Sequence, residues 1–532
     1  MKKIYILLLL SINFQLFAQE PTIGLKYYDS NAYDGLTLFT PERSGNVYLM
    51  NNCGEVVNSW DTGLNTLISY ITESGNLIVA GGGEVEIRDW DNNLLWQYDF
   101  RGNGYRLHHD IEPLPNGNFL IITNDVRTQA TAIQAGRNPA LIDTNVKLDS
   151  ILEIEPTGTN SFNIVWQWNI FDHLVQDFDS SKDNFGVVAN SPHLIDFNYQ
   201  TSDLQDWTHV NSVDYNSTLD QIVISARSMS EVYIIDHSTT TSEAAGHTGG
   251  NSGKGGDILW RWGNPAVYQQ GTTFDQQLFE QHDPTWISNP NPNEGMLTIF
   301  SNNTGSDYSS VIVVNPNTNT LGNYTFSNGN LFAPESEVWS WNGQVQGENV
   351  FSNKKGGFSA LPNGNYLISE TVNGRIIEID NSGNAVWVYR IPEDVNGIIN
   401  QYSTNYGSIF KCYKYPSDYI GFISQDLTPQ GIIESENIIS DNCMSALSTE
   451  NISISEIKIY PNPTNSIINF KTQTNNSFDI CIYNSQGIEV FSKNEVTNRL
   501  VLPNTIQSGI YFVKVTNADN KNTKTIKLII NQ

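Results

Sequence analysis

The sequence has few basic side chains, few cysteines and almost no long amphipathic helical patterns. Among its 532 residues, 28 are lysine or arginine and 56 are aspartate or glutamate, so the formal net charge is −28. Contacts to nucleic-acid phosphates need a basic face, and this charge balance argues against DNA or RNA as a partner. It also means that a site for an anionic ligand has to concentrate positive charge locally.

Long apolar runs are also scarce. One lies at the start, over Ile4–Phe17, after the basic Lys2 and Lys3 and before Ala18. It is too short to span a bilayer and predicts a secretory signal peptide over residues 1–18, with a membrane anchor as the alternative. No later segment is long and apolar enough to cross a membrane, so no span is expected in the mature protein.

The four cysteines form no Cys-x-x-Cys pair, which argues against a zinc ribbon or a thioredoxin-like site. Export makes disulfides possible. Cys412 and Cys443 flank the end of the large domain, and the sequence leaves open whether they are bonded to each other. Cys53 and Cys481 are interpreted as lone buried thiols.

The chain is rich in glycine and asparagine, and one hairpin unit recurs. Ser74–Val79, Asn116–Ile121 and Asn363–Ile368 each place a glycine in a turn and an apolar strand after it. The positive φ angles that such residues allow predict two-residue hairpin turns. Gly75 and Gly117 are 42 residues apart, a spacing typical of propeller blades.

Tryptophan marks the end of each unit and is expected to pack between neighbouring blades. The six clusters are Trp60, Trp96, Trp166 with Trp168, Trp260 with Trp262, Trp339 with Trp341, and Trp387. Together with the hairpins they predict an all-β fold, a six-bladed β-propeller within residues 19–425. Ser238–Gly256 is a polar insertion in one long interval. Within it, Gly249–Gly256 lacks the spacing of a phosphate loop and is interpreted as a flexible surface insertion.

The composition changes after the propeller. Residues 426–456 are predicted to form a linker, and residues 457–532 a small Ig-like β-sandwich with alternating strands. Ile457–Pro463 and the strand Gly509–Val515 resemble the C-terminal sorting domain of type IX secretion. That resemblance implies export by the type IX secretion machinery, and a secreted or cell-surface location.

Three of the eight histidines share one position of the repeat. His109, His209 and His282 each stand at the start of the strand that leads into a hairpin, and Gly356 takes this position in the last such unit. The innermost strands of a propeller line its axial channel, so these side chains are expected to converge there. The neighbouring His108 is the alternative to His109.

The returning strands end in further polar residues. Arg227 and Asn302 occupy this position in two units, and a guanidinium there suits a tetrahedral oxyanion. The plain alternatives are structural histidines and a strand-end salt bridge for Arg227. Three histidines also suit zinc, but the sequence shows no carboxylate close to them, so neither a metal nor a cofactor is expected. The remaining histidines, which do not follow the repeat, are interpreted as surface or loop residues: His173, His193, His237 and His247.

Several of these segments together resemble the bacterial aryl-sulfate sulfotransferases. They are, in order, His108-His109-Asp110, His209-x-Asn211-Ser212, Ser225-Ala226-Arg227, Gln281-His282-Asp283 and Phe300-Ser301-Asn302. The resemblance implies an exported six-bladed propeller that transfers sulfate from an aryl sulfate donor to a phenolic acceptor, without nucleotide-activated sulfate. His282 would carry a covalent sulfo group in two displacements.

The same resemblance implies roles for the other residues. His109, His209 and Arg227 would act beside His282, and Asn211, His108 and Asn302 would bind substrate. The Ser238–Gly256 insertion departs from the family and is expected to reshape the rim of the channel. Two other functions stay open: a propeller that binds sulfated or aromatic ligands without turnover, and a quinoprotein-like redox propeller, for which no calcium-binding acidic set is evident.

Overall fold

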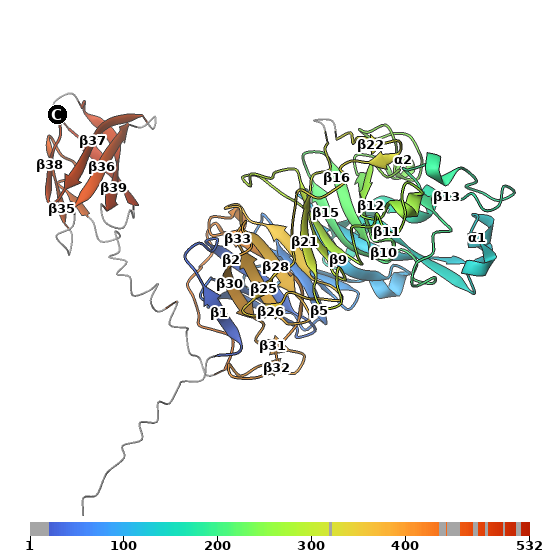
Figure 1. The fold of residues 1–532 in the computed structure, drawn as a ribbon. Helices are drawn as coiled ribbons and strands as arrows, with labels where there is room; N and C mark the ends of the chain where they lie inside the picture. Colours follow the sequence, from blue (N-terminus) through green and yellow to red (C-terminus); the bar gives the residue numbers. More distant parts are fainter. Residues whose placement is uncertain are drawn as a thin grey trace, which may run out of the picture. The chain divides into compact units, whose positions relative to one another are not determined.

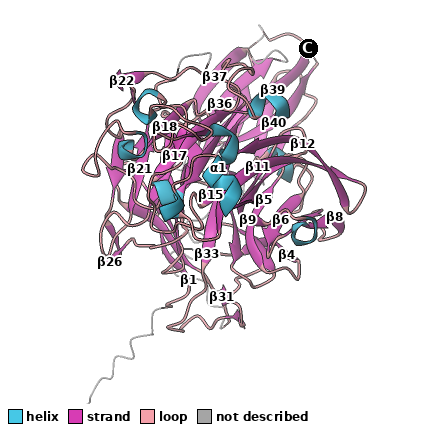
Figure 2. Ribbon diagram, turned by 90° about the vertical axis from the view of Figure 1, so that its right-hand side faces the viewer, coloured by secondary structure: helices cyan, strands magenta, loops and turns pink. Residues whose placement is uncertain are grey.

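Strands make up most of the molecule, and helices are few and short (Figure 2). The computed structural model describes residues 21–318, 322–435, 443, 458–471, 477–484, 488–503, 506–517 and 523–531. The chain divides into two units, residues 1–440 and 441–532. The predicted signal peptide and most of the predicted linker lie outside the described residues. Within the described residues, no helix is apolar and long enough to reach across a membrane.

The described part of the first unit contains six antiparallel sheets of four or more strands. Three of them are, in strand order, β33 (Ile409–Pro416), β2 (Gly35–Pro41), β3 (Asn46–Met50) and β4 (Val56–Asp61); β5 (Thr66–Ile71), β6 (Leu77–Gly81), β7 (Glu84–Arg88) and β8 (Leu94–Asp99); and β9 (Leu107–Pro113), β10 (Phe119–Thr128), β11 (Asn145–Thr157) and β12 (Ser161–Asn169). The others are β15 (Val210–Asn216), β16 (Gln221–Ala226), β17 (Glu231–Asp236) and β18 (Trp260–Trp262); β19 (His282–Trp286), β20 (Leu297–Ser301), β21 (Ser310–Val314) and β24 (Trp339–Trp341); and β27 (Gly357–Ala360), β28 (Tyr366–Glu370), β29 (Arg375–Ile379), β30 (Ala385–Arg390) and β1 (Gly24–Tyr28).

The first-named strands of these sheets contact one another in a closed cycle, which runs β33, β5, β9, β15, β19, β27 and back to β33. This is how the inner strands of a propeller surround its axis. The all-β class and the propeller-like arrangement predicted from the sequence are confirmed. The number of blades stays an interpretation, for which these six sheets are the basis.

Both ends of the unit take part in its closure. β2 pairs with β33, placing Gly35 opposite Pro416, and β1 pairs with β30, placing Gly24 opposite Arg390. In Figure 1 the blue strand β1 therefore lies beside the orange strand β30. The chain also stays bonded to this unit beyond Gln425, because Gln430 donates its backbone N–H to Val56 O and Ser435 bridges to Asn400.

The tryptophans join neighbouring sheets, as expected. The indole N–H of Trp60 donates to Asp89 O in the next sheet at 2.9 Å, and that of Trp96 to Ser161 O at 2.8 Å. Trp387 completes the series from the last sheet to the first through Asn52 O, at 2.7 Å. Each bond satisfies the one polar atom of a large buried ring.

The loops of the recurrent hairpins contain three residues, one more than predicted. Gly75 has φ 80° and donates its N–H to Thr72 O, while Thr72 N donates to Asn76 O at 2.9 Å. This is a three-residue loop with glycine in the left-handed region rather than a two-residue turn. Gly117 and Gly364, with φ 88° and 90°, repeat the geometry.

The cysteine interpretations need correction. Cys53 and Cys443 are disulfide-bonded, and Cys412 and Cys481 are free thiols. A Cys412–Cys443 bond is therefore wrong, and so is the interpretation of Cys53 as a lone thiol. Burial raises the pKa of Cys412 to about 12, so this thiol stays protonated and unreactive.

The second unit forms two small antiparallel sheets. One contains β34 (Lys458–Tyr460), β35 (Ile467–Lys471) and β38 (Arg499–Val501); the other contains β36 (Phe478–Asn484), β37 (Glu489–Val496), β39 (Gly509–Asn517) and β40 (Thr523–Ile530). Ile468, Ile480, Val513 and Leu528 are buried in one shared core. The alternation of apolar and polar residues predicted this arrangement.

Two histidines assigned to the surface or to loops are buried or half-buried instead. His173 is fully buried at the end of the 3₁₀ segment Ile170–His173. His237 contacts two carboxylates, with Nδ1 at 2.8 Å from Asp220 Oδ1 and Nε2 at 3.1 Å from Glu153 Oε2. Burial alone would lower the pKa of His237, but these two carboxylates raise it to about 9.

We expect this ion triad to stabilise the fold in a pH-dependent way. The pKa of His237 is higher in the folded chain than the value of about 6.5 in an unfolded one, so its contribution is complete below about pH 6.5. It is lost as the pH rises through about 9. Chemical denaturation should therefore show that His237→Gln destabilises strongly near pH 6 and weakly near pH 10. An equal loss at both pH values would contradict this account.

Candidate active site

Register shifts in the inner strands lie next to the three predicted histidines and influence the direction of their side chains. Five of the six inner strands carry a register shift against the strand beside them. His109 lies within the register shift of β9. His209 lies just before the register shift of β15, and His282 lies where the register shift of β19 begins. Such bulges turn side chains out of the regular alternation and are common beside active sites. His109 and His209 also have positive φ, 58° and 49°, which non-glycine residues rarely adopt.

His282 is buried, 2% exposed, with a defined tautomer. Its Nδ1 lies 2.7 Å from Asn302 Oδ1, while Asn302 Nδ2 donates to the carbonyls of Ser352 and Lys355. Asn302 Oδ1 is therefore an acceptor and His282 Nδ1 carries the proton. The Nε2 atom keeps its lone pair, which accepts the Lys355 backbone N–H at 3.2 Å.

His109 and His209 lie close to each other and, together with His282, form what we call the histidine cluster. Their ring centroids are 4.9 Å apart, and Phe410 lies against the rings of both His109 and His282, at 6.4 and 6.2 Å. Asp206 Oδ2 is 2.8 Å from His209 Nδ1 and orients that ring. Burial would raise the pKa of Asp206, but its bonds to His209 and Lys147 lower it to about 2, so this carboxylate is ionised.

His108 lies behind His109. Its Nδ1 is 2.8 Å from His109 Nδ1, and its Nε2 is 3.1 Å from Asp149 Oδ1. Asp149 in turn accepts from Thr208 Oγ1 and from the backbone N–H of Val210. His108 thus connects His109 to a buried carboxylate, and His109 is the histidine that lies with His209.

Positive charge gathers at this point of a strongly acidic chain. Burial first, and then the charges of Arg227 and His209, lower the pKa of His282 to about 3, even though its bond to Asn302 acts the other way. Burial, with His108, His209, His282 and Lys355 nearby, holds the pKa of His109 well below its usual range. Both rings are therefore neutral at pH 7 beside the side chains of Arg227 and Lys355.

The two cations have carboxylate partners. Arg227 donates to Glu280 Oε2 at 2.7 Å, and Lys355 Nζ to Glu42 Oε1 at 2.7 Å. The strand-end salt bridge considered for Arg227 is thus present. Both side chains are about a quarter exposed, so each is partly open to solvent.

Asn211 and Asn302, predicted to bind substrate, are fully buried. Asn302 uses both of its N–H groups on backbone carbonyls and its oxygen on His282. Asn211 Nδ2 donates to Gln281 O at 2.9 Å, which connects β15 to the residue just before His282. These contacts place both amides where they position His282.

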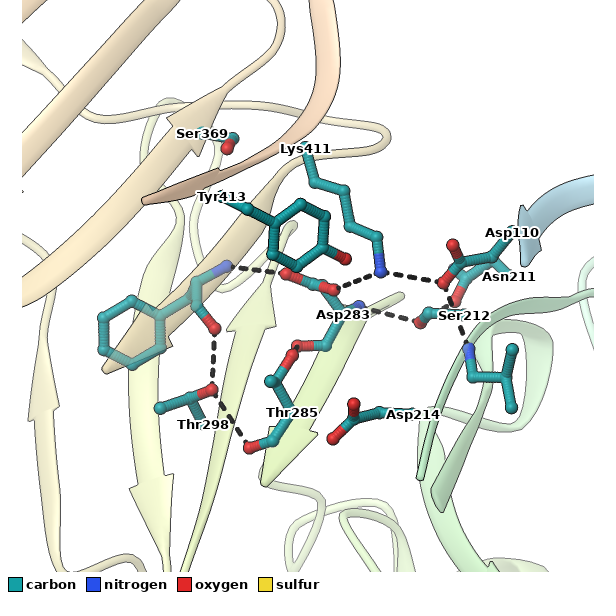
Figure 3. Close-up of polar contacts among 12 residues, drawn as sticks. Asp110, Asn211, Ser212, Asp214, Asp283, Thr285, Thr298, Ser369, Lys411 and Tyr413 are labelled. Atoms are coloured by element: carbon teal, nitrogen blue, oxygen red, sulfur yellow. Dashed lines mark hydrogen bonds and ion pairs between the residues drawn. The ribbon is translucent and has the colours of Figure 1, made fainter. Parts of the chain in front are cut away.

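A buried ion cluster lies beside the histidines on the same strands. Lys411 Nζ is 2.9 Å from Asp110 Oδ2 and 3.0 Å from Asp283 Oδ1, as Figure 3 shows. Asp110 and Asp283 directly follow His109 and His282 in the chain. The cluster therefore holds three inner strands, β9, β19 and β33, at the level of the two histidine-bearing bulges.

A cavity of about 590 Å³ lies at the hairpin ends of the inner strands, and Tyr70, Glu112, Asp214 and Tyr413 are among its lining residues. Burial raises the pKa of Asp214 to about 7. The histidines stand at the opposite ends of their strands, so this cavity is separate from the histidine cluster.

Sequence reasoning missed Lys355, Phe410, Asp206 and Lys411. Lys355 could have been predicted, because it directly precedes Gly356, which occupies the position equivalent to His109, and the chain has few cations. Phe410 and Lys411 belong to β33, which comes from the far end of the unit and carries no histidine. Their strand could not be aligned with the repeat by its sequence.

Comparison with known proteins identifies a family for each of the two units. A family model described as arylsulfotransferase (ASST) matches residues 66–391, more than half of the chain. A second model, the secretion system C-terminal sorting domain, matches residues 458–531. No curated protein matches the chain.

Among solved structures, the chain is similar to a protein of unknown function from Bacteroides caccae, with 13% identity, a TM-score of 0.39, and coverage of 72% of this chain and 99% of that one. It is also similar to a streptogramin B lyase, with 10% identity, a TM-score of 0.32, and coverage of 70% and 88%. At these scores neither likeness bears on function.

The sorting domain shows export by type IX secretion, to the cell surface or beyond it. The match over residues 66–391 includes His109, His209 and His282. The chain therefore belongs to the arylsulfotransferase (ASST) family.

Proposed function

We propose that the chain is an aryl-sulfate sulfotransferase that moves a sulfuryl group from a phenolic sulfate ester to a phenol through a covalent sulfo-histidine on His282. The observation that carries this proposal is the His282 tautomer. Nδ1 is committed to Asn302, and Nε2 keeps a lone pair among cationic groups. With its pKa lowered to about 3, His282 is a neutral nucleophile throughout the physiological range.

In the first displacement, His282 Nε2 attacks the sulfur of the donor. The N–S bond forms, the S–O bond to the aryl group breaks, and the leaving phenolate takes a proton from His209. Arg227 and Lys355 bind the sulfuryl oxygens, and the Lys355 N–H is released from Nε2 to donate to one of them. In the second displacement, the acceptor phenol gives its proton to the same histidine while its oxygen attacks sulfur, and the N–S bond breaks.

The proposal predicts phenol-dependent turnover. The purified chain, incubated with a chromogenic aryl sulfate, should release its phenol slowly alone and faster with added acceptor phenol, because the acceptor discharges the sulfo-enzyme. Rates at several concentrations of both substrates should follow a ping-pong pattern, and peptide mapping should find a sulfuryl adduct on the His282 peptide. Absence of release and adduct across several aryl sulfates would favour a propeller that only binds such ligands.

A further inference from the structure

The glycine-rich insertion has a defined fold away from the histidine cluster. Its start forms α2 (Thr241–Ala244), with a capping box between Thr240 and Glu243. It contacts β12, the strand of its sheet furthest from the axis, where Trp168 Nε1 donates to Gly256 O at 2.7 Å. The expectations of a flexible insertion and of a reshaped channel rim are therefore corrected: the segment packs on the outer edge of the unit.

Three possible metal ligands meet under this segment. His173, His247 and Asp257 each direct one ligand atom to a common point, and these atoms all lie within 4.8 Å of one another. His173 Nδ1 is 2.9 Å and His247 Nδ1 is 2.8 Å from the same atom, Asp257 Oδ1. None of the three residues lies on an inner strand, so the cluster is distinct from the candidate active site.

The contacts of His173 fix the orientation of its ring in this cluster. Its Nε2 is 2.8 Å from Ala244 O, which can only accept, so Nε2 carries a proton. Its Nδ1, the second ligand atom of the ring, faces Asp257 Oδ1 at 2.9 Å. The ring is fully buried and stacked on Trp168 at 5.5 Å, so it cannot turn away. The Nδ1 atom is therefore held in place beside the other two ligand atoms.

We propose that His173, His247 and Asp257 bind a Zn²⁺ ion that fastens the insertion to the neighbouring sheet. Two imidazole nitrogens and one carboxylate oxygen are a zinc donor set, with water as the fourth ligand. The bond from His173 Nε2 to Ala244 O is the outer-shell contact that zinc-binding histidines usually make. Tetrahedral zinc holds its ligand atoms about 3.3 Å apart, so the two distances from the histidine nitrogens to Asp257 Oδ1, 2.9 and 2.8 Å, need to lengthen only slightly.

The placement of the ligands explains what the ion does. His247 and Asp257 stand at the two ends of a loop that the Gly256 N–H to Gly246 O bond already closes at 3.0 Å. His173 comes from the segment after β12, in the adjacent sheet. A Cβ atom on Gly256 would lie 2.0 Å from Ala244 O and 2.7 Å from His173 Nε2, so only glycine allows this close approach.

The test uses the full chain, stripped with a chelator and then dialysed against zinc chloride. Elemental mass spectrometry should find about one more zinc ion per chain in the wild type than in His247→Ala. His247 is largely exposed, so this variant should fold. A second variant, Asp257→Asn, should lose the same ion. His209→Ala, which removes a residue of the histidine cluster, should retain it.

Thermal unfolding supplies a second readout. Zinc in excess should raise the Tm of the wild type by roughly 2–4 °C through binding to the folded state, and leave that of His247→Ala unchanged. Equal zinc content in the two proteins, or the same Tm shift in both, would overturn the proposal. In that case the three side chains form only a hydrogen-bonded cluster.

Discussion

His282→Ala should abolish sulfuryl transfer, lowering turnover by at least ~10⁴-fold, the scale on which enzymes lose activity when a covalent nucleophile is removed. The physical reason is that the Nε2 lone pair is the electron pair that forms the N–S bond. Without it, the donor and acceptor would have to react directly in one displacement. The measurement is the rate of phenol release from a chromogenic aryl sulfate, with peptide mapping for the sulfuryl adduct.

His193→Gln is the matched control, because His193 bonds to Ile258 O in a peripheral loop, outside the cluster. It should keep turnover and adduct. His282→Gln guards against a folding defect, since it fills much of the space while lacking the imidazole. If either His282 variant kept wild-type turnover, His282 would not be the nucleophile.

Lys411→Met should lower the free energy of unfolding by about 3–5 kcal/mol, as when one partner of a buried ion pair is removed. Lys411 is 4% exposed and lies between Asp110 and Asp283, so its loss leaves two buried carboxylates without a cation. Because these aspartates follow His109 and His282, turnover should fall as well. Urea denaturation measures the first effect, and the phenol-release assay the second.

Two further proteins make this result interpretable. Lys182→Met removes a half-buried lysine that makes no ion pair among the described residues, and should change stability by no more than about 0.5 kcal/mol. Lys411→Met combined with Asp110→Asn and Asp283→Asn should recover much of the stability, because no charge then stays buried unpaired. Equal unfolding of Lys411→Met and Lys182→Met would show that the cluster does not hold the strands together.

Most of the architecture was predictable because its signals are local. A glycine such as Gly75 is needed wherever a tight loop requires positive φ, and a tryptophan such as Trp60 recurs wherever one sheet covers the next. The loop length was mispredicted because two- and three-residue turns share the same residues. The disulfide was mispredicted because distance along the chain does not decide which cysteines meet.

The candidate site was predicted in part. The repeat register selected His109, His209 and His282, and the structure brings them together with Arg227. The repeat register could not distinguish a positioning role from substrate binding for Asn211 and Asn302, since an amide that binds substrate and one that orients a histidine look alike in sequence. Nor could it single out Asp206, a carboxylate like many others in an acidic chain.

By itself, the sequence determined the strand pattern, the repeat, the sorting domain and the residue types available for histidine chemistry, because each depends on neighbouring residues. Only the tertiary structure decided which distant groups meet. Lys411 lies 301 residues from Asp110 and 128 from Asp283, and His173 lies 84 from Asp257. Closing the ring of sheets brings these pairs into contact, and burial then makes each pairing strong, because a charge or a lone pair removed from water must find its partner within the protein.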